Sequence, residues 1–72
     1  MDEQFRLRST DEFIKLGQLL KAAGLVDSGA EAKDEIINGN VKVNGEVEVR
    51  RGKKLKDGDI VSFAGKTVKI IR

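Results

Sequence analysis

Cationic side chains are concentrated in one short segment of the chain. Residues 50–56 read Arg-Arg-Gly-Lys-Lys-Leu-Lys, so five of these seven residues are basic. Cations that neutralise phosphates release condensed counterions, and the planar guanidinium of arginine matches two phosphate oxygens at once. The segment therefore predicts a contact surface for a polyanion, with a solvated loop that serves solubility as the alternative. Its predicted contacts are Arg50, Arg51, Lys53 and Lys54, which together with Gly52 we call the basic turn.

Further candidate contacts lie outside the basic turn. Ser28 precedes a predicted helix whose exposed amides and positive dipole end attract anions, and Lys33 follows one turn later. Simple capping of that helix is the alternative role of Ser28. Lys15 lies on the polar side of an earlier predicted helix, where Lys21 is expected to be an ordinary solvated lysine. The further candidates are Lys15, Ser28, Lys33, Lys42 and Asn44.

The chain lacks the residues that most often carry out catalysis or bind metals. The chain contains no His and no Cys, which removes the commonest general base, the thiolate and the imidazole ligand. Asp57 and Asp59 flank a turn glycine and are too few for a metal site. There is no Tyr or Trp, and we expect Phe5, Phe13 and Phe63 in the core, so bases are not expected to stack on aromatic rings. We predict no catalytic residue, no metal and no cofactor.

Charge is distributed unevenly along the 72 residues. Residues 1–40 carry five basic and eight acidic groups, whereas residues 41–72 carry nine basic and four acidic ones, for a formal net charge of +2. Such asymmetry suggests one basic face that meets a polyanion. No apolar run approaches the roughly 18 residues of a membrane span, and the acidic start is unlike a signal peptide. We therefore expect a cytoplasmic protein without membrane contact.

Two capping-box sequences predict two helices. Residues 9–12, Ser-Thr-Asp-Glu, precede a helix that is expected to continue to about Ala23. Residues 28–31, Ser-Gly-Ala-Glu, precede a second helix, expected at 29–38 and ended by Gly39 in a left-handed conformation. Spacings of three and four residues give each helix an apolar stripe. The predicted stripes comprise Phe13, Leu16, Leu19, Leu20 and Ala23 in the first helix, and Ala32 and Ile36 in the second.

Alternation with a period of two predicts a hairpin after the helices. Asn-Gly at residues 44–45 separates residues 41–43 from residues 46–49, and this dipeptide favours a type I′ turn because both positions take a positive φ. The residues expected to share the buried face of the hairpin are Val41, Val43, Val47 and Val49.

The remaining strands complete a small sheet. Residues 60–63 and 67–71 are predicted to pair, residues 5–8 to add a strand at an edge, and Leu55 to anchor the basic turn in the core. One strand, two helices and four short strands make an α+β fold, in which two packed helices lie against a small antiparallel or mixed twisted sheet of four to five strands. We expect a single domain over residues 1–72.

Several motifs resemble the RNA-binding domain named after ribosomal protein S4, which contains the alpha-L motif. The resemblance spans residues 15–65, with the core motif at about 13–65, and it is most specific at Gly-Asn-Val-Lys-Val-Asn-Gly (39–45) and Gly-Asp (58–59). The run Val-Asn-Gly-x-Val-Glu-x-Arg-Arg-Gly at 43–52 is similar to the stand-alone bacterial branch of the YbcJ and YaaA type. The resemblance implies that the two helices and the following turn form an RNA-binding surface.

Two departures from the wider S4 pattern concern charge. Gly17 stands where an acidic residue is usual, and Gly29 and Ala30 stand where basic residues are frequent. The second helix therefore carries less positive charge than in the wider family, which shifts the expected phosphate contacts toward the basic turn.

Three hypotheses for the function follow. The first is a monomeric, non-catalytic binder of structured RNA (ribosomal, transfer or small RNA) in ribosome function or RNA metabolism. The alternative is a protein-interaction adaptor on a ribosome or on a replication or repair complex, where Asp11 and Glu12 would attract a basic partner. An RNA-modifying enzyme is the third, and the lack of His and Cys argues against it. A pull-down that survives nuclease treatment would favour the adaptor.

Overall fold

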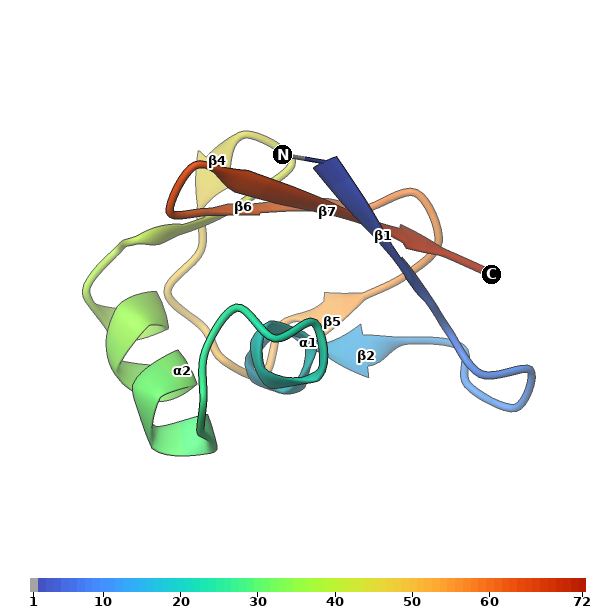
Figure 1. The fold of residues 1–72 in the computed structure, drawn as a ribbon, viewed down its shortest axis with the longest axis horizontal. Helices are drawn as coiled ribbons and strands as arrows, with labels where there is room; N and C mark the ends of the chain where they lie inside the picture. The colour runs from blue at the N-terminus through green and yellow to red at the C-terminus, as the bar shows by residue number, and fades with distance from the viewer. Residues whose placement is uncertain (1) are drawn as a thin grey trace.

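A five-stranded sheet lies over two helices in the computed structural model, which describes residues 2–72 (Figure 1). The sheet order is β1-β7-β6-β3-β4, with β1 parallel to β7 and all other neighbours antiparallel. A separate two-stranded sheet joins β2 to β5. The elements are β1 Asp2–Arg6, β2 Ile14–Lys15, α1 Leu16–Ala22, α2 Gly29–Ile37, β3 Val41–Val43, β4 Glu46–Val47, β5 Lys54–Leu55, β6 Ile60–Phe63 and β7 Lys66–Ile71. The predicted α+β fold class is thus confirmed, including a mixed sheet of five strands.

The first helix begins later than its sequence predicts. The prediction of a capping box at residues 9–12 is wrong: this segment contains a turn and a bend, and residues 14–15 pair with β5 instead. Helix α1 begins at Leu16, and the residue that precedes it, Lys15, makes no side-chain capping hydrogen bond. Consequently Phe13 is outside the helix and 40% exposed, which contradicts its predicted place in the core.

The second helix follows its predicted course. Helix α2 covers residues 29–37, its buried residues are Ala32 and Ile36, and Gly39 follows it with a φ of +78°.

Both helices are short: α1 has seven residues and α2 has nine. In the part of the chain that the structure describes, no helix is both long and apolar enough to cross a membrane.

The hairpin of β3 and β4 has the predicted turn but a different buried face. Asn44 and Gly45 take φ values of 53° and 85°, as a type I′ turn requires. Across this two-residue turn Val43 pairs with Glu46, so Val47 pairs with Lys42 on the outer face. Directly paired residues share a face, and the prediction that Val47 and Val49 point inward is therefore wrong: each is 54% exposed.

The core lies between the sheet and the two helices. Helix α1 contributes Leu16, Leu19 and Leu20, each with no exposed surface, and the inner faces of the sheet strands cover them. Leu55 is likewise fully buried, which confirms that it anchors the end of the basic turn. The buried set is Leu7, Leu16, Leu19, Leu20, Val26, Ala32, Ile36, Val41, Val43, Leu55, Val61, Val68 and Ile70.

Candidate nucleic-acid interface

A basic groove of about 380 Å³ lies where α1, the start of α2 and the basic turn meet. Four cationic residues from four different segments line it, and none of the described residues that line it is acidic. All four are exposed, and within residues 2–72 their side chains make no hydrogen bond or ion pair with the protein. These residues, which define the basic groove, are Lys15 of β2, Lys21 of α1, Lys33 of α2 and Arg51 of the basic turn.

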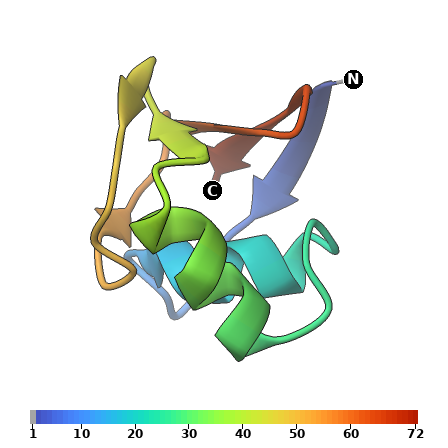
Figure 2. The same ribbon diagram turned by 90° about the vertical axis from the view of Figure 1, so that its left-hand side faces the viewer.

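Backbone hydrogen bonds hold the basic turn against the start of α1. The amide of Leu16 donates to the carbonyl of Lys53 at 2.8 Å, and the amide of Gly17 donates to the carbonyl of Arg51 at 3.0 Å. Helix-terminal amides need such partners when no side chain caps them. Figure 2 shows the segment between β4 and β5 descending from the sheet to the level of the helices. The fold therefore fixes the backbone of Arg51 beside the first turn of α1.

Glycines keep this region open. A Cβ on Gly17 would lie 3.6 Å from the Cβ and the carbonyl oxygen of Arg51, so a longer side chain at this position would enter the space beside the arginine. An acidic side chain at this position would therefore lie next to Arg51. Gly29 and Gly52 also line the groove, and a Cβ on either would meet no atom within 4 Å. The absence of these side chains leaves the backbone open to a ligand.

Helix α2 begins at the groove with a side-chain cap. The Ser28 hydroxyl accepts from the amide of Glu31 at 3.1 Å, and the amide of Asp27 donates to the Glu31 carboxylate at 2.9 Å. The predicted capping box is thus confirmed, although Glu31 reaches one residue further back than Ser28. The cap fixes where α2 begins and, one turn later, where Lys33 lies.

The side chains of the basic turn point in different directions. Arg51 lines the basic groove, whereas Arg50 and Lys53 line a separate hollow of about 310 Å³ beside the β3–β4 hairpin. The ammonium of Lys54 lies 4.9 Å from the centre of the Phe13 ring, a cation–π contact. The basic turn is therefore a point from which cations reach three neighbouring surfaces, rather than one cluster.

Arg50 is engaged by a carboxylate of the same hairpin. Its Nε lies 3.0 Å from Oε2 of Glu48, its Nη2 lies 3.2 Å from Oε1, and its amide also donates to Oε2 at 3.1 Å. The hydrogen bond from the Arg50 side chain lowers the pKa of Glu48, and the same contact raises the pKa of Arg50. Glu48 thus offsets the charge of Arg50, whereas the Arg51 side chain forms no ion pair with the residues that the structure describes.

Two of the predicted contacts lie away from the groove. Lys42 is on the outer face of the sheet, opposite Val47 and Ser62. The side-chain amide of Asn44 donates to Asp59 at 3.1 Å, and its oxygen accepts from the amide of Ile60 at 2.9 Å. Asn44 therefore connects the hairpin turn to the start of β6, and this structural role was not foreseen.

Some groove residues were missed by the sequence reasoning. Lys21, which was expected to be an ordinary solvated lysine, lines the groove together with Gln18. The sequence contained a signal for this position, because Gln18 and Lys21 are three residues apart and therefore lie on one side of α1. Of the predicted contacts, Lys15, Lys33 and Arg51 do converge in the groove. Within residues 2–72, no group of three or more acidic residues is placed to hold a metal ion.

Comparison with known proteins gives consistent similarities. A family model of the S4 domain matches residues 5–71. YbcJ of Escherichia coli (strain K12), whose name describes it as a candidate RNA-binding protein, is 47% identical over 58 residues, which cover 81% of this chain and 83% of YbcJ. RlbA of Bacillus subtilis (strain 168), by name a candidate ribosome maturation protein, is 46% identical over 54 residues, which cover 75% of this chain and 76% of RlbA.

A solved structure has the same fold. The solution structure of E. coli YbcJ, described as revealing an alpha-L motif involved in RNA binding, superimposes with a TM-score of 0.71 at 42% identity. The match covers 96% of this chain and 86% of the YbcJ chain. Since both chains are covered over most of their length, the similarity concerns the whole arrangement of helices and sheet and is not limited to one motif.

Proposed function

Because this chain belongs to the S4 domain family and has the alpha-L fold, we propose that it is a non-catalytic RNA-binding protein. Its basic groove would hold the phosphate backbone of a structured RNA, which is ribosomal, transfer or small RNA. The relatives named for RNA binding and for ribosome maturation support this proposal. The RlbA relative makes ribosomal RNA the first class to test.

The convergence of four cations is the observation that carries the proposal. Lys15, Lys21, Lys33 and Arg51 come from four segments of the chain, line one groove and leave their charges unpaired within the described residues. Solvated lysines kept only for solubility would not need to share one hollow free of described acidic residues. Each phosphate that they neutralise releases counterions, while the Arg51 fork adds a contact of defined geometry.

The other predicted contacts take secondary places in the proposal. Lys53 and Lys54 add positive charge beside the β3–β4 hairpin and the Phe13 ring, and Arg50 can join them only when its guanidinium exchanges Glu48 for a phosphate. Ser28 keeps its hydroxyl proton available for a phosphate oxygen, because in the cap its oxygen acts as an acceptor. We do not propose that Lys42 or Asn44 contacts the same RNA.

Binding of a labelled ribosomal RNA fragment over a range of salt concentrations tests the proposal. With four phosphate contacts, affinity should fall roughly a thousandfold between about 50 and 500 mM salt. Lys33→Ala and Arg51→Ala should each weaken binding and reduce the salt slope by about 0.7 to 0.9. Lys69→Ala removes the same charge from the outer face of the sheet and is the matched control.

Three results would contradict the proposal. Binding that does not change with salt would exclude phosphate contacts as its basis. Equal losses of RNA affinity in Arg51→Ala and Lys69→Ala would mean that a charge in the groove contributes no more to binding than a charge on the sheet. Retention of protein partners after nuclease treatment, without any RNA affinity of the purified protein, would favour the adaptor alternative.

A further inference from the structure

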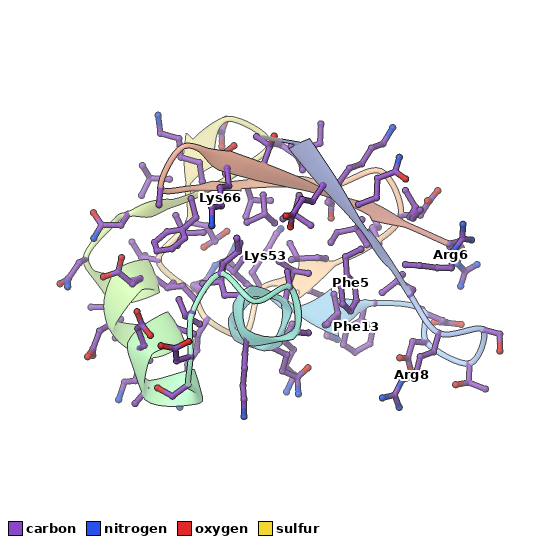
Figure 3. The ribbon with its side chains drawn as sticks, in the orientation of Figure 1. Phe5, Arg6, Arg8, Phe13, Lys53 and Lys66 are labelled. Atoms are coloured by element: carbon purple, nitrogen blue, oxygen red, sulfur yellow. The ribbon has the colours of Figure 1, made fainter. Side chains whose placement is uncertain are left out.

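A second groove, of about 500 Å³, lies on the other side of Gln18 from the basic groove. The end of β1, the loop that follows it, β2 and α1 form its walls, and Gln18 of α1 lines both grooves. Phe5, Phe13 and Arg8 also line it. In Figure 3 the labelled ring of Phe13 lies below that of Phe5, between α1 and the loop that carries Arg8.

An aromatic ring in this groove is open to solvent. Phe13 is 40% exposed, although a large apolar ring gains free energy when it is buried. The Lys54 ammonium lies 4.9 Å from the ring centre. Phe5, which lines the same groove, is partly buried and packs against the core. A solvent-exposed ring with a nearby cation is the type of platform on which a nucleic-acid base stacks.

Arg8 is the cationic residue among the described residues that line the second groove, and Lys15 lines the neighbouring basic groove. Within residues 2–72, the Arg8 side chain makes no hydrogen bond or ion pair. A strand whose phosphates follow these two cations would pass its bases over the ring of Phe13. Gln18 and Asp11, which also line the groove, have groups that can hydrogen-bond to base edges.

We propose that the Phe13 groove binds an unpaired base of the RNA held in the basic groove. The inference rests on the proposed RNA-binding function and adds that the protein prefers RNA with an unpaired nucleotide next to a stem. The base would take the place of the Lys54 ammonium on the ring, and the ammonium would then neutralise an adjacent phosphate. A fully base-paired stem has no unpaired base, so it would contact the basic groove alone.

Three RNA probes, two Phe13 variants and one control variant test this inference. The probes are a hairpin with a 3′ overhang of adenosines, the same hairpin with abasic residues in the overhang, and the blunt hairpin. The wild-type protein should bind the adenosine overhang roughly tenfold more tightly than either of the other two. Phe13→Leu keeps an apolar side chain and should lose this preference while its affinity for the blunt hairpin is unchanged.

A tryptophan variant makes the contact visible. The chain contains no Trp, so Phe13→Trp introduces a single reporter whose ring can still stack. It should keep the preference for the overhang, and its fluorescence should be quenched by the adenosine overhang and not by the abasic one. Ile60→Ala, which truncates a side chain 41% exposed on the outer face of the sheet, should behave as the wild type on all three probes.

The outcomes separate this inference from the function on which it rests. Equal affinity of the wild type for the adenosine and abasic overhangs, or an undiminished preference in Phe13→Leu, overturns the base site and leaves RNA binding intact. A Phe13→Leu variant that loses affinity for all three probes alike also overturns it, because the ring would then support the fold rather than contact a base. Failure of the wild type to bind any of the hairpins overturns both proposals.

Discussion

Arg50 and Arg51 are neighbours in the chain, but their guanidinium groups have different surroundings. Glu48 binds Arg50 through two hydrogen bonds between their side chains, whereas Arg51 faces the basic groove. If the carboxylate restrains Arg50, Glu48→Gln should release it for a phosphate. We expect this variant to bind ribosomal RNA more tightly at low salt, with a salt slope steeper by about 0.7 to 0.9 for the added contact. Filter binding over a salt series measures both.

The control for Glu48→Gln is Glu46→Gln. Both glutamates are in the same hairpin and line the same hollow, and both substitutions remove one negative charge. Within the described residues Glu46 forms no ion pair, so its loss should raise affinity without a comparable change in slope. Identical behaviour of the two variants would show that net charge alone, and not the release of Arg50, accounts for the gain.

The same pair makes a pH-dependent contribution to stability. Folding lowers the pKa of Glu48, chiefly through its hydrogen bond from the Arg50 side chain, so the folded state favours the ionised form. The contribution is therefore present above the ordinary pKa of a glutamate and is lost as pH falls through the lowered value. Urea unfolding at about pH 7 and about pH 3, on either side of that ordinary pKa, should show that Glu48→Gln is less stable than the wild type at the higher pH and that the difference is smaller at the lower pH. The difference should be small, because the Arg50 side chain is 71% exposed.

At the residue scale, the sequence predicts which residues of the site are charged, but it does not predict which surface each side chain faces. Residue type identified Lys15, Lys33 and Arg51 as cations that could meet a phosphate, and all three line the basic groove. Which way each residue of the basic turn faces depends on hydrogen bonds to distant parts of the chain. The carbonyl of Arg51 accepts from α1, and no local pattern in residues 50–54 encodes that contact.

Two serines with the same predicted capping role behave differently at the level of the element. Ser28 accepts from the amide of Glu31, whereas Ser9 precedes no helix. Ser28→Ala should therefore cost about 0.5–2 kcal/mol, and Ser9→Ala should cost almost nothing. In a domain of this size, each 1 kcal/mol lowers the Tm by about 4–8 °C. Thermal denaturation of both variants under one buffer condition gives the comparison, and an equal loss of Tm in both would contradict the assigned cap.

Local sequence patterns do not suffice to predict where every helix begins. The capping-box pattern occurs twice in the sequence, but only the second box forms, because residues 14–15 pair with residues 54–55 before α1 begins. Two-residue strands gain little from propensity, so this pairing depends on tertiary contacts. The prediction for β4, in contrast, was wrong although the sequence contains the information: a two-residue turn pairs Val43 with Glu46 and thus turns Val47 outward.

The whole molecule separates two faces with different exposed groups. Figure 1 shows the sheet on one side and both helices on the other, and the basic groove lies among the helices. The outer face of the sheet mixes lysines with exposed apolar residues such as Val47 and Ile60. Hydrophobic alternation predicted this layering, since period-two strands and helix stripes must bury their apolar sides together. The separation of Lys42 from the other predicted contacts follows from it.

Two charge-reversal variants test whether RNA affinity depends on where a charge lies or on the net charge of the molecule. Lys33→Glu and Lys42→Glu each lower the formal net charge from +2 to zero. Lys33 lines the basic groove, whereas Lys42 is on the outer face of the sheet. At about 0.15 M salt the Debye length is about 8 Å, so charges on opposite faces act almost independently. Lys33→Glu should therefore weaken binding of the ribosomal RNA fragment at least tenfold, the loss expected for about 1.4 kcal/mol. Lys42→Glu should stay within about threefold of the wild type, a margin of less than 1 kcal/mol. Equal losses would mean that the overall field, or an RNA path across the sheet, replaces the groove.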